Sequence, residues 1–128
     1  MADILIVDDD PDVRSTLRHA LEQAGHNARD AANGWLGLQL LAALRFDLAV
    51  IDIIMAKPDG LDVVRIARSR GDEVPILIVT GAIDIDGEDL VAAAIHLGAN
   101  RALIKPFRPS EFISTIAEML AAARYRRM

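Results

Sequence analysis

The sequence predicts an α/β fold in which a five-stranded, doubly wound parallel sheet is flanked by five helices. Short segments that suit strands alternate five times with segments of helical periodicity. Most of the strand segments are near-continuous apolar runs, as expected for strands buried on both faces. Such alternation implies right-handed crossover connections, and the length of 128 residues predicts one domain that spans residues 1–128.

Five segments are expected to form the strands. They cover residues 4–7, 26–31, 48–51, 75–79 and 101–104. The second of them is too polar to be identified from its pattern alone, and its place between two helices carries its assignment. The third, which contains Leu48 and Ile51, is the centre of the predicted sheet, and turn residues separate it from the next helix.

The predicted helices alternate with these strands. Asp10 followed by Pro11 is a typical helix start, because a capping side chain precedes a proline at the first helical position. That helix ends at Gly25, and Asn33 caps a second helix that runs to residue 44. The third helix is expected to begin at Gly60 and to end at Gly71. The fourth is expected to end at Gly98, and the last to begin near Pro109.

Composition limits the functional classes. The 128 residues carry a net charge of −5, which argues against direct binding of nucleic acid by this domain. No apolar run approaches the roughly 20 residues of a membrane span, and no secretory signal is recognisable. The chain has no cysteine, which excludes disulfides and thiolate metal sites. We therefore expect a cytoplasmic protein without a membrane partner.

Polar side chains follow four of the predicted strands where each strand ends. They are Asp8 and Asp9 after the first strand, Asp52 after the third, Thr80 after the fourth and Lys105 after the last. Parallel strands deliver these positions to one edge of the sheet, where ligands bind in open α/β folds. Two carboxylates about 4 Å apart repel by about 4 kcal/mol at an effective dielectric constant near 20. Either a proton is trapped there, or a cation lies among the carboxylates.

A hard divalent cation suits this edge. Mg²⁺, or Mn²⁺ in its place, prefers one or two carboxylates and leaves positions for phosphate oxygens. Lys105 and Thr80 would add a positive charge and a hydroxyl donor, both of which a phosphate group can use. Together these groups favour phosphoryl transfer, in which a carboxylate can itself be the nucleophile and form an aspartyl phosphate.

Over essentially its whole length, the chain resembles the receiver domain of two-component response regulators. The residues that carry the resemblance are Ile4-Leu5-Ile6-Val7 with Asp8-Asp9, Asp52 with Met55 and Asp59-Gly60, Thr80 after its apolar strand, and Lys105-Pro106-Phe107. Each motif alone is weak, but their order and spacing are specific. The resemblance implies a flavodoxin-like sheet with strand order 2-1-3-4-5.

The resemblance also implies roles for the acids. Asp52 would accept a phosphoryl group from a histidine of a sensor histidine kinase or of a histidine phosphotransfer protein. Asp9 and Asp52 would ligate Mg²⁺ directly, and Asp8 would do so directly or through water. The main-chain carbonyl of Ile54 would complete the protein's ligands. The chain would be a signalling domain that catalyses only its own phosphorylation and slow dephosphorylation, and not a turnover enzyme.

In the same resemblance, Lys105 would pair with the phosphoryl group and Thr80 would move to hydrogen-bond it. That movement would reshape the surface formed by the fourth helix, the last strand and the last helix. No output domain is visible in the sequence, so the chain either acts alone or is the receiver of a longer regulator. The downstream partner, the cognate kinase and any homodimer stay open.

Several positions depart from the family's pattern. Ala102 stands where receivers usually carry an aromatic ring that turns inward with the threonine. Ala56 replaces the usual proline, and Pro58 follows two residues later. The segment 81–89 is longer than usual, is read as a polar loop and is either a partner-specific loop or a tolerated surface insertion.

Two further departures concern apolar residues. Trp35 and Leu36 open the second helix where acids are common; we expect Trp35 to pack locally, the alternative being an exposed interface pair. Ile54 and Ala82 occupy the positions that flank the hydrolytic water in receivers. Since neither side chain can orient water, we expect slow self-dephosphorylation.

The sequence leaves two alternative functions open. The first is a small phosphatase of the haloacid dehalogenase type, whose motifs Asp8-x-Asp10, Thr80 and Lys105 imitate. Against it, Asp12 stands where that family usually has threonine or valine, and a later acidic pair is missing. The second is a receiver-like interaction module that works without phosphorylation, which the loss of the aromatic ring at residue 102 keeps open.

Overall fold

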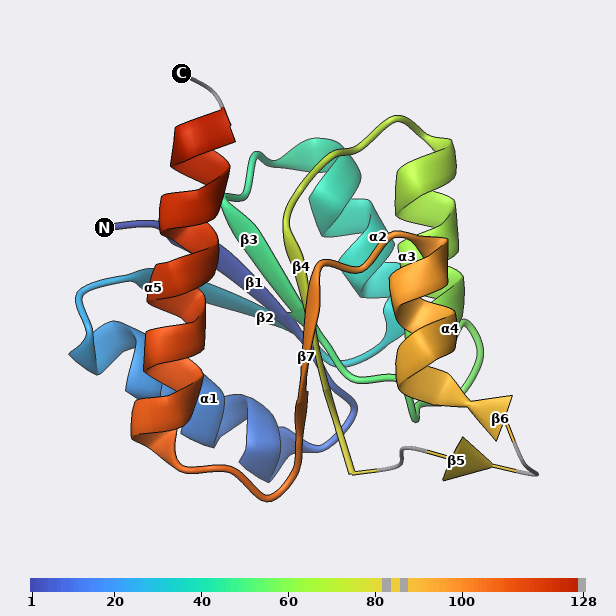
Figure 1. Cartoon of the computed structure of the whole chain (residues 1–128), viewed down its shortest axis with the longest axis horizontal. Coiled ribbons are helices and arrows are strands. Elements are labelled where there is room, and N and C mark those ends of the chain that lie inside the picture. The colour runs from blue at the N-terminus through green and yellow to red at the C-terminus, as the bar shows by residue number, and fades with distance from the viewer. Residues whose placement is uncertain (82–83, 86–87, 127–128) are drawn as a thin grey trace.

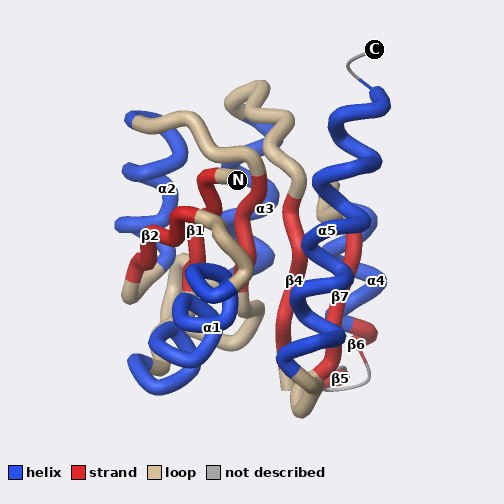
Figure 2. Tube along the Cα trace, turned by 90° about the vertical axis from the view of Figure 1, so that its left-hand side faces the viewer, coloured by secondary structure: helices blue, strands red, loops and turns tan. Residues whose placement is uncertain are grey.

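The computed structural model describes residues 1–81, 84–85 and 88–126. A parallel sheet lies between two layers of helices, as Figures 1 and 2 show from two directions. Its strands are β1 (Asp3–Val7), β2 (Asn27–Ala31), β3 (Leu48–Ile51), β4 (Ile76–Thr80) and β7 (Arg101–Ile104). The order β2-β1-β3-β4-β7 confirms the predicted topology, since β7 is the fifth strand of this sheet.

Five helices in the described part of the chain cover the sheet, as predicted. They are α1 (Pro11–Gln23), α2 (Gly34–Ala43), α3 (Gly60–Ser69), α4 (Leu90–Leu97) and α5 (Pro109–Arg126). No helix in the described part of the chain combines the length and the apolar character that a membrane crossing requires.

Among the residues described, the core consists of two apolar clusters, one on each face of the sheet. Successive strand residues alternate between them, so that Leu5 and Val7 pack with α2, α3 and α4. Ile4 and Ile6 point the other way and pack with α1 and α5. Because β1, β3 and β4 are buried on both faces, the side chains at their ends are placed with little freedom.

The helix termini follow the predicted chemistry. Asp10 caps α1 by accepting hydrogen bonds from the backbone N–H groups of Asp12 and Val13. Gly25 follows the end of that helix with φ of 89°, a conformation that suits glycine. Asn33 caps α2 in the same manner as Asp10 caps α1.

The start of α3 approaches the end of β3 closely. A Cβ atom on Gly60 would lie against the main-chain oxygen of Asp52 and 2.6 Å from the Cα of Ile53. The Gly60 N–H also donates to the Ile53 carbonyl at 3.0 Å. Only glycine fits this contact without a shift of the backbone, so Gly60 fixes the distance between the first turn of α3 and Asp52.

Two expectations about exposed segments are wrong. The segment expected to be a polar loop contains an antiparallel pair, β5 (Asp84–Ile85) with β6 (Glu88–Asp89). Two-residue strands leave no periodic signal in a sequence, which explains the error. Residues 82–83 and 86–87, including Ala82, lie outside the described residues. Trp35 was expected to pack locally, but it is 63% exposed and Leu36 is 38% exposed, because both point away from the face that α2 buries.

Candidate functional site

The predicted acids meet at the carboxyl edge of the sheet. Val7 and Ile51 are register partners in the parallel pairing of β1 with β3, so the residues that follow them leave the sheet side by side. Carboxylate oxygens of Asp8, Asp9 and Asp52 all lie within 4.8 Å of one another. Asp8 and Asp52 are buried, whereas Asp9 is exposed. The sequence therefore identified all three members of this cluster.

Lys105 brings a positive charge to the same cluster. Its Nζ atom lies 3.2 Å from Oδ2 of Asp8 and 3.4 Å from Oδ2 of Asp52. The lysine follows β7, and its backbone N–H donates to the carbonyl of Thr80 at 2.9 Å. Since β7 is three strands away from β1 in the sheet, the long lysine side chain is what allows the last strand to reach Asp8.

Backbone donors hold the two buried carboxylates. The N–H of Asp10 donates to Oδ1 of Asp8 at 3.0 Å, and the N–H of Ile54 donates to Oδ1 of Asp52 at 3.3 Å. These bonds fix one oxygen of each carboxylate and direct the other, Oδ2, toward Lys105. The site is thus preorganised around the Oδ2 atoms of Asp8 and Asp52.

Burial and charge shift the ionisation of this group. Burial raises the pKa of Asp52 above its ordinary value of 3.8, and the carboxylate of Asp8 adds to this effect against the opposing charge of Lys105. Burial alone would lower the pKa of Lys105, but the charges of Asp52 and Asp8 outweigh it and raise that pKa above 10.5. The ammonium is therefore held in its charged form, while Asp52 is a more basic carboxylate than usual.

The other predicted residues lie around this centre. Thr80 is the last residue of β4, is fully buried and pairs in register with Ile104. Ile54 follows Asp52 by two residues and its side chain is 44% exposed. Ala102 is half-buried on β7 and packs against the core, with no ring to turn inward. The roles of Thr80 and of the Ile54 carbonyl stay predictions.

The donor set fits a hard divalent cation. Three carboxylates from the ends of two strands converge, and carboxylate oxygens are the ligands that Mg²⁺ takes in proteins. Asp10, by contrast, caps α1, and its Oδ1 accepts the backbone N–H of Asp12 at 2.9 Å. The paired acids Asp8-x-Asp10 that a haloacid dehalogenase would use are therefore divided between the site and a helix cap.

No sequence pattern indicated one contact of the site. The guanidinium of Arg14, near the start of α1, donates to the main-chain oxygen of Asp8 at 2.8 Å. The only local signal was an arginine in the helix that directly follows the acidic turn. Such a contact depends on the direction of a long side chain, which spacing alone does not specify.

Known proteins of one family match this chain. Residues 4–117 match the sequence profile of the response regulator receiver domain. The response regulator MprA of Mycolicibacterium vanbaalenii is 38% identical over 117 residues, which are 91% of this chain and 49% of that protein. MprA of Mycobacterium ulcerans is 37% identical over the same length. The chain thus spans about half the length of these curated relatives.

Solved structures agree with the sequence match. A response regulator receiver domain protein from Methanospirillum hungatei superposes with a TM-score of 0.90 at 25% identity, covering 98% of each chain. A response regulator described as putative, from Chloroflexus aurantiacus, has a TM-score of 0.84 at 33% identity and covers 94% of this chain and 98% of its own. The chain belongs to the response regulator receiver domain family.

Proposed function

We propose that the chain, residues 1–128, is a phosphoacceptor receiver in which Asp52 takes a phosphoryl group from a histidine. The donor would be a sensor histidine kinase or a histidine phosphotransfer protein. One observation carries the proposal: the buried carboxylate of Asp52 lies 3.4 Å from Nζ of Lys105 at the carboxyl edge of the sheet. A more basic carboxylate beside a fixed positive charge suits attack on an anionic phosphoryl group.

The chemistry follows from these positions. A carboxylate oxygen of Asp52 attacks the phosphorus, and the bond between phosphorus and the donor's imidazole nitrogen breaks. The electron pair of that bond stays on the imidazole, which leaves as a neutral ring when its other nitrogen carries a proton. An acyl phosphate remains on Asp52, and Lys105 turns from the carboxylates toward the phosphoryl oxygens.

Asp8, Asp9 and Asp52 would hold Mg²⁺ or Mn²⁺, with the main-chain carbonyl of Ile54 as a further ligand. The bound cation would neutralise charge on the phosphoryl oxygens. The carboxylates of Asp8 and Asp52 would position the cation, because a backbone N–H group fixes one oxygen of each carboxylate. Chelation of the cation should therefore stop phosphorylation.

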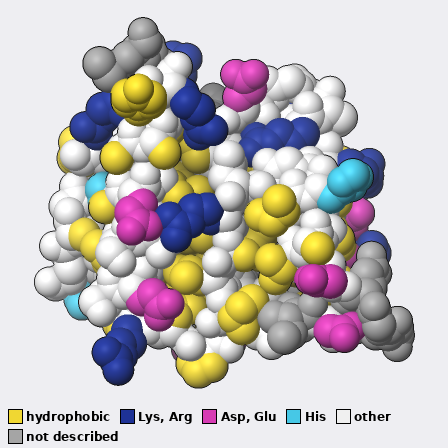
Figure 3. Space-filling model, viewed as in Figure 1, with side chains coloured by type: hydrophobic (Ala, Val, Ile, Leu, Met, Phe, Trp, Pro, Cys, Tyr) yellow, Lys and Arg dark blue, Asp and Glu magenta, His cyan; other side chains and the backbone are white. Residues whose placement is uncertain are grey.

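Signal output would pass through the surface formed by α4, β7 and α5. Thr80 ends β4, and its backbone carbonyl accepts a hydrogen bond from the Lys105 N–H; this proximity supports a role for its hydroxyl in the response to a phosphoryl group at this edge. Hydrophobic side chains gather on the surface beside β7 (Figure 3). Ile95 on α4 and Ile104 on β7 are each more than 40% exposed. The recipient would be a downstream protein, a linked output domain or a second copy of the chain.

Hydrolysis of the acyl phosphate should be slow. Ile54 is 44% exposed and apolar, so its side chain cannot orient a water molecule for attack. Replacement of Ile54 by Asn or Glu should change the decay rate of the phosphorylated protein. An unchanged decay rate in both variants would contradict this assignment.

The acceptor is tested by intact-mass analysis after incubation with acetyl phosphate and Mg²⁺. We expect one base-labile phosphoryl addition in the wild type and none in Asp52→Asn. Asp62→Asn is the matched control, because this aspartate also pairs with a lysine but belongs to the cap of α3. No adduct, together with no binding of beryllofluoride in the presence of Mg²⁺, would favour the interaction module that works without phosphorylation.

A further inference from the structure

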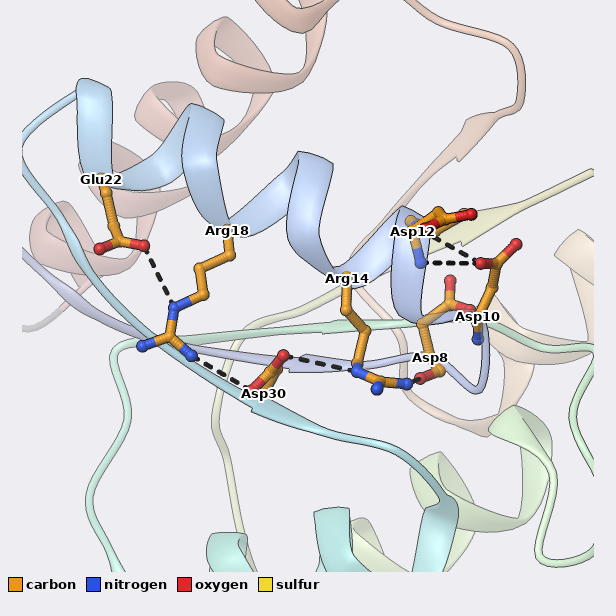
Figure 4. Close-up of polar contacts among 8 residues, drawn as sticks. Asp8, Asp10, Asp12, Arg14, Arg18, Glu22 and Asp30 are labelled. Atoms are coloured by element: carbon orange, nitrogen blue, oxygen red, sulfur yellow. Dashed lines mark hydrogen bonds and ion pairs between the residues drawn. The ribbon is translucent and has the colours of Figure 1, made fainter.

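Arg14 joins the acidic turn to two other elements. Its Nη1 atom donates to the main-chain oxygen of Asp8 at 2.8 Å, while its Nε atom lies 3.4 Å from Oδ2 of Asp30 on β2 (Figure 4). The Arg14 side chain is only 17% exposed. One planar guanidinium therefore connects helix α1, strand β2 and the turn that carries Asp8 and Asp9.

We propose that Arg14 is a positioning residue for the divalent cation, with Asp30 as its anchor. By holding the main chain at Asp8, it gives the acidic turn the shape that presents Asp8 and Asp9 to the ion. The inference rests on the proposed function and deepens it. It concerns a residue outside the acid cluster, one that would act through the backbone and not as a ligand.

The turn needs the support of Arg14 because few contacts hold the side chain of Asp9 in place. Asp9 is exposed, and its carboxylate makes no hydrogen bond or ion pair with another described residue. Its direction depends on the backbone, which is held by the bond from the Asp8 N–H to the Ala31 carbonyl at 3.2 Å and by the contact with Arg14. Loss of the Arg14 contact would free the carbonyl side of this turn.

An arginine suits this role better than a lysine. Its fixed fork reaches two acceptors at once, the carbonyl of Asp8 and the carboxylate of Asp30, whereas an ammonium group is a single point charge on a flexible stem. Lys105, the other cation near the acids, would turn to the phosphoryl group in the proposed reaction. Arg14 would stay in place and continue to offset the repulsion between the carboxylates.

Arg18 provides a matched control on the same helix. It lies about one turn further along α1, and its Nη1 atom is 3.2 Å from Oδ1 of the same Asp30. Its Nε atom is 3.1 Å from Oε1 of Glu22, and among the described residues its polar contacts are with Glu22 and Asp30 and not with the acidic turn (Figure 4). The variant Arg18→Gln therefore removes one positive charge and one partner of Asp30, and leaves the support of Asp8 intact.

The experiment measures Mg²⁺ affinity by isothermal titration calorimetry at constant ionic strength. For Arg14→Gln we expect the dissociation constant to rise roughly tenfold, as is usual when a group that orients a metal ligand is removed. Arg14→Lys should show most of the same loss although it keeps the charge, and Asp30→Asn a smaller one. Arg18→Gln should stay within about twofold of the wild type.

Each variant is also unfolded with urea in EDTA, which separates positioning from stability. Affinities of the Arg14 variants equal to that of Arg18→Gln would overturn the inference, even if their stability falls. Should Arg14→Gln not fold, Arg14→Lys decides by the same criterion. A wild type that binds no Mg²⁺ would contradict the metal site of the proposed function, which is a different outcome from equal affinities.

Discussion

Two groups of one lysine and two aspartates each include residues that follow β3, and their carboxylates have pKa shifts in opposite directions. The site group is Asp8, Asp52 and Lys105, and the loop group is Asp59, Asp62 and Lys57. The nitrogen-to-oxygen distances are 3.2 and 3.4 Å in the site group and 3.1 and 3.3 Å in the loop group. Nevertheless, the pKa of Asp52 is raised and that of Asp62 is lowered.

Burial explains the difference. The carboxylate side chains are 1% and 9% exposed in the site group, against 21% and 22% in the loop group. In the loop group the pKa of Asp62 falls because burial, which alone would raise it, is outweighed by the Asp59 N–H and by Lys57. Pairing with a lysine alone therefore does not decide whether the pKa of an aspartate is raised or lowered. The desolvated carboxylate of Asp52 suits the proposed phosphoryl site, whereas the more exposed carboxylates of the loop group stabilise the start of α3.

The largest contrast should appear in phosphorylation. We expect Lys105→Met to slow adduct formation from acetyl phosphate roughly 100-fold, because the charge that stabilises the phosphoryl oxygens is lost. Lys57→Met removes the lysine of the loop group, whose ion-pair distances are nearly the same. The phosphorylation rate of this variant should stay within about twofold of the wild type. Equal rates in the two variants, measured by mass spectrometry over time, would remove the functional distinction between the groups.

The junction between the groups offers the largest effect on stability. A methyl group at Gly60, the residue after Asp59, would meet the main chain of Asp52 and Ile53. Gly60→Ala should lower the free energy of unfolding by about 2–3 kcal/mol. Gly81→Ala is the control, since nothing lies within 4 Å of a Cβ there, and it should change stability by less than about 1 kcal/mol. Urea unfolding followed by circular dichroism gives both values.

Replacing one carboxylate in each group should change stability with opposite signs. Asp52→Asn removes a desolvated charge and should raise the free energy of unfolding in EDTA by about 1 kcal/mol. Asp62→Asn removes a charge from the first turn of α3 and should lower it by about 0.5 kcal/mol. Changes of the same sign in the two variants would show that burial does not separate the groups.

The gain from Asp52→Asn should also depend on pH. Because the pKa of Asp52 is raised by folding, the wild-type residue favours the folded state below its ordinary pKa of 3.8 and loses that contribution as the pH rises. The advantage of the variant should therefore shrink as the pH falls from 7 toward 3.8. For Asp62, whose pKa is lowered, the contribution is present at neutral pH and is lost in acid. A difference that grows in acid would contradict the assignment for Asp52.

Much of the fold and of the candidate site could be predicted because both depend on local patterns. β1, β3 and β4 are short apolar runs, and parallel strands bring the residues at their carboxyl ends to one edge. That single rule placed Asp8, Asp52 and Lys105 together. The repulsion between Asp8 and Asp52 also follows from it, and this repulsion adds to burial, the main cause of the raised pKa of Asp52.

Features that depend on the direction of individual side chains could not be predicted. Trp35 was expected to pack locally and is exposed, because the pattern of α2 does not show which apolar residues its buried face takes. The contact of Arg14 with Asp8 joins a helix to a turn through a long side chain. Residue spacing indicates neither the exposure of Trp35 nor the contact of Arg14. The strands β5 and β6 are too short to produce a periodic pattern.

The exposure of Trp35 has a practical consequence for spectroscopy. It is the only tryptophan in the chain, and its indole ring is already in contact with water when the protein is folded. Its emission should therefore be red-shifted in the native state and change little in wavelength on denaturation. A nearly constant emission maximum would thus report where this ring lies on α2, and it would not indicate that the protein resists unfolding.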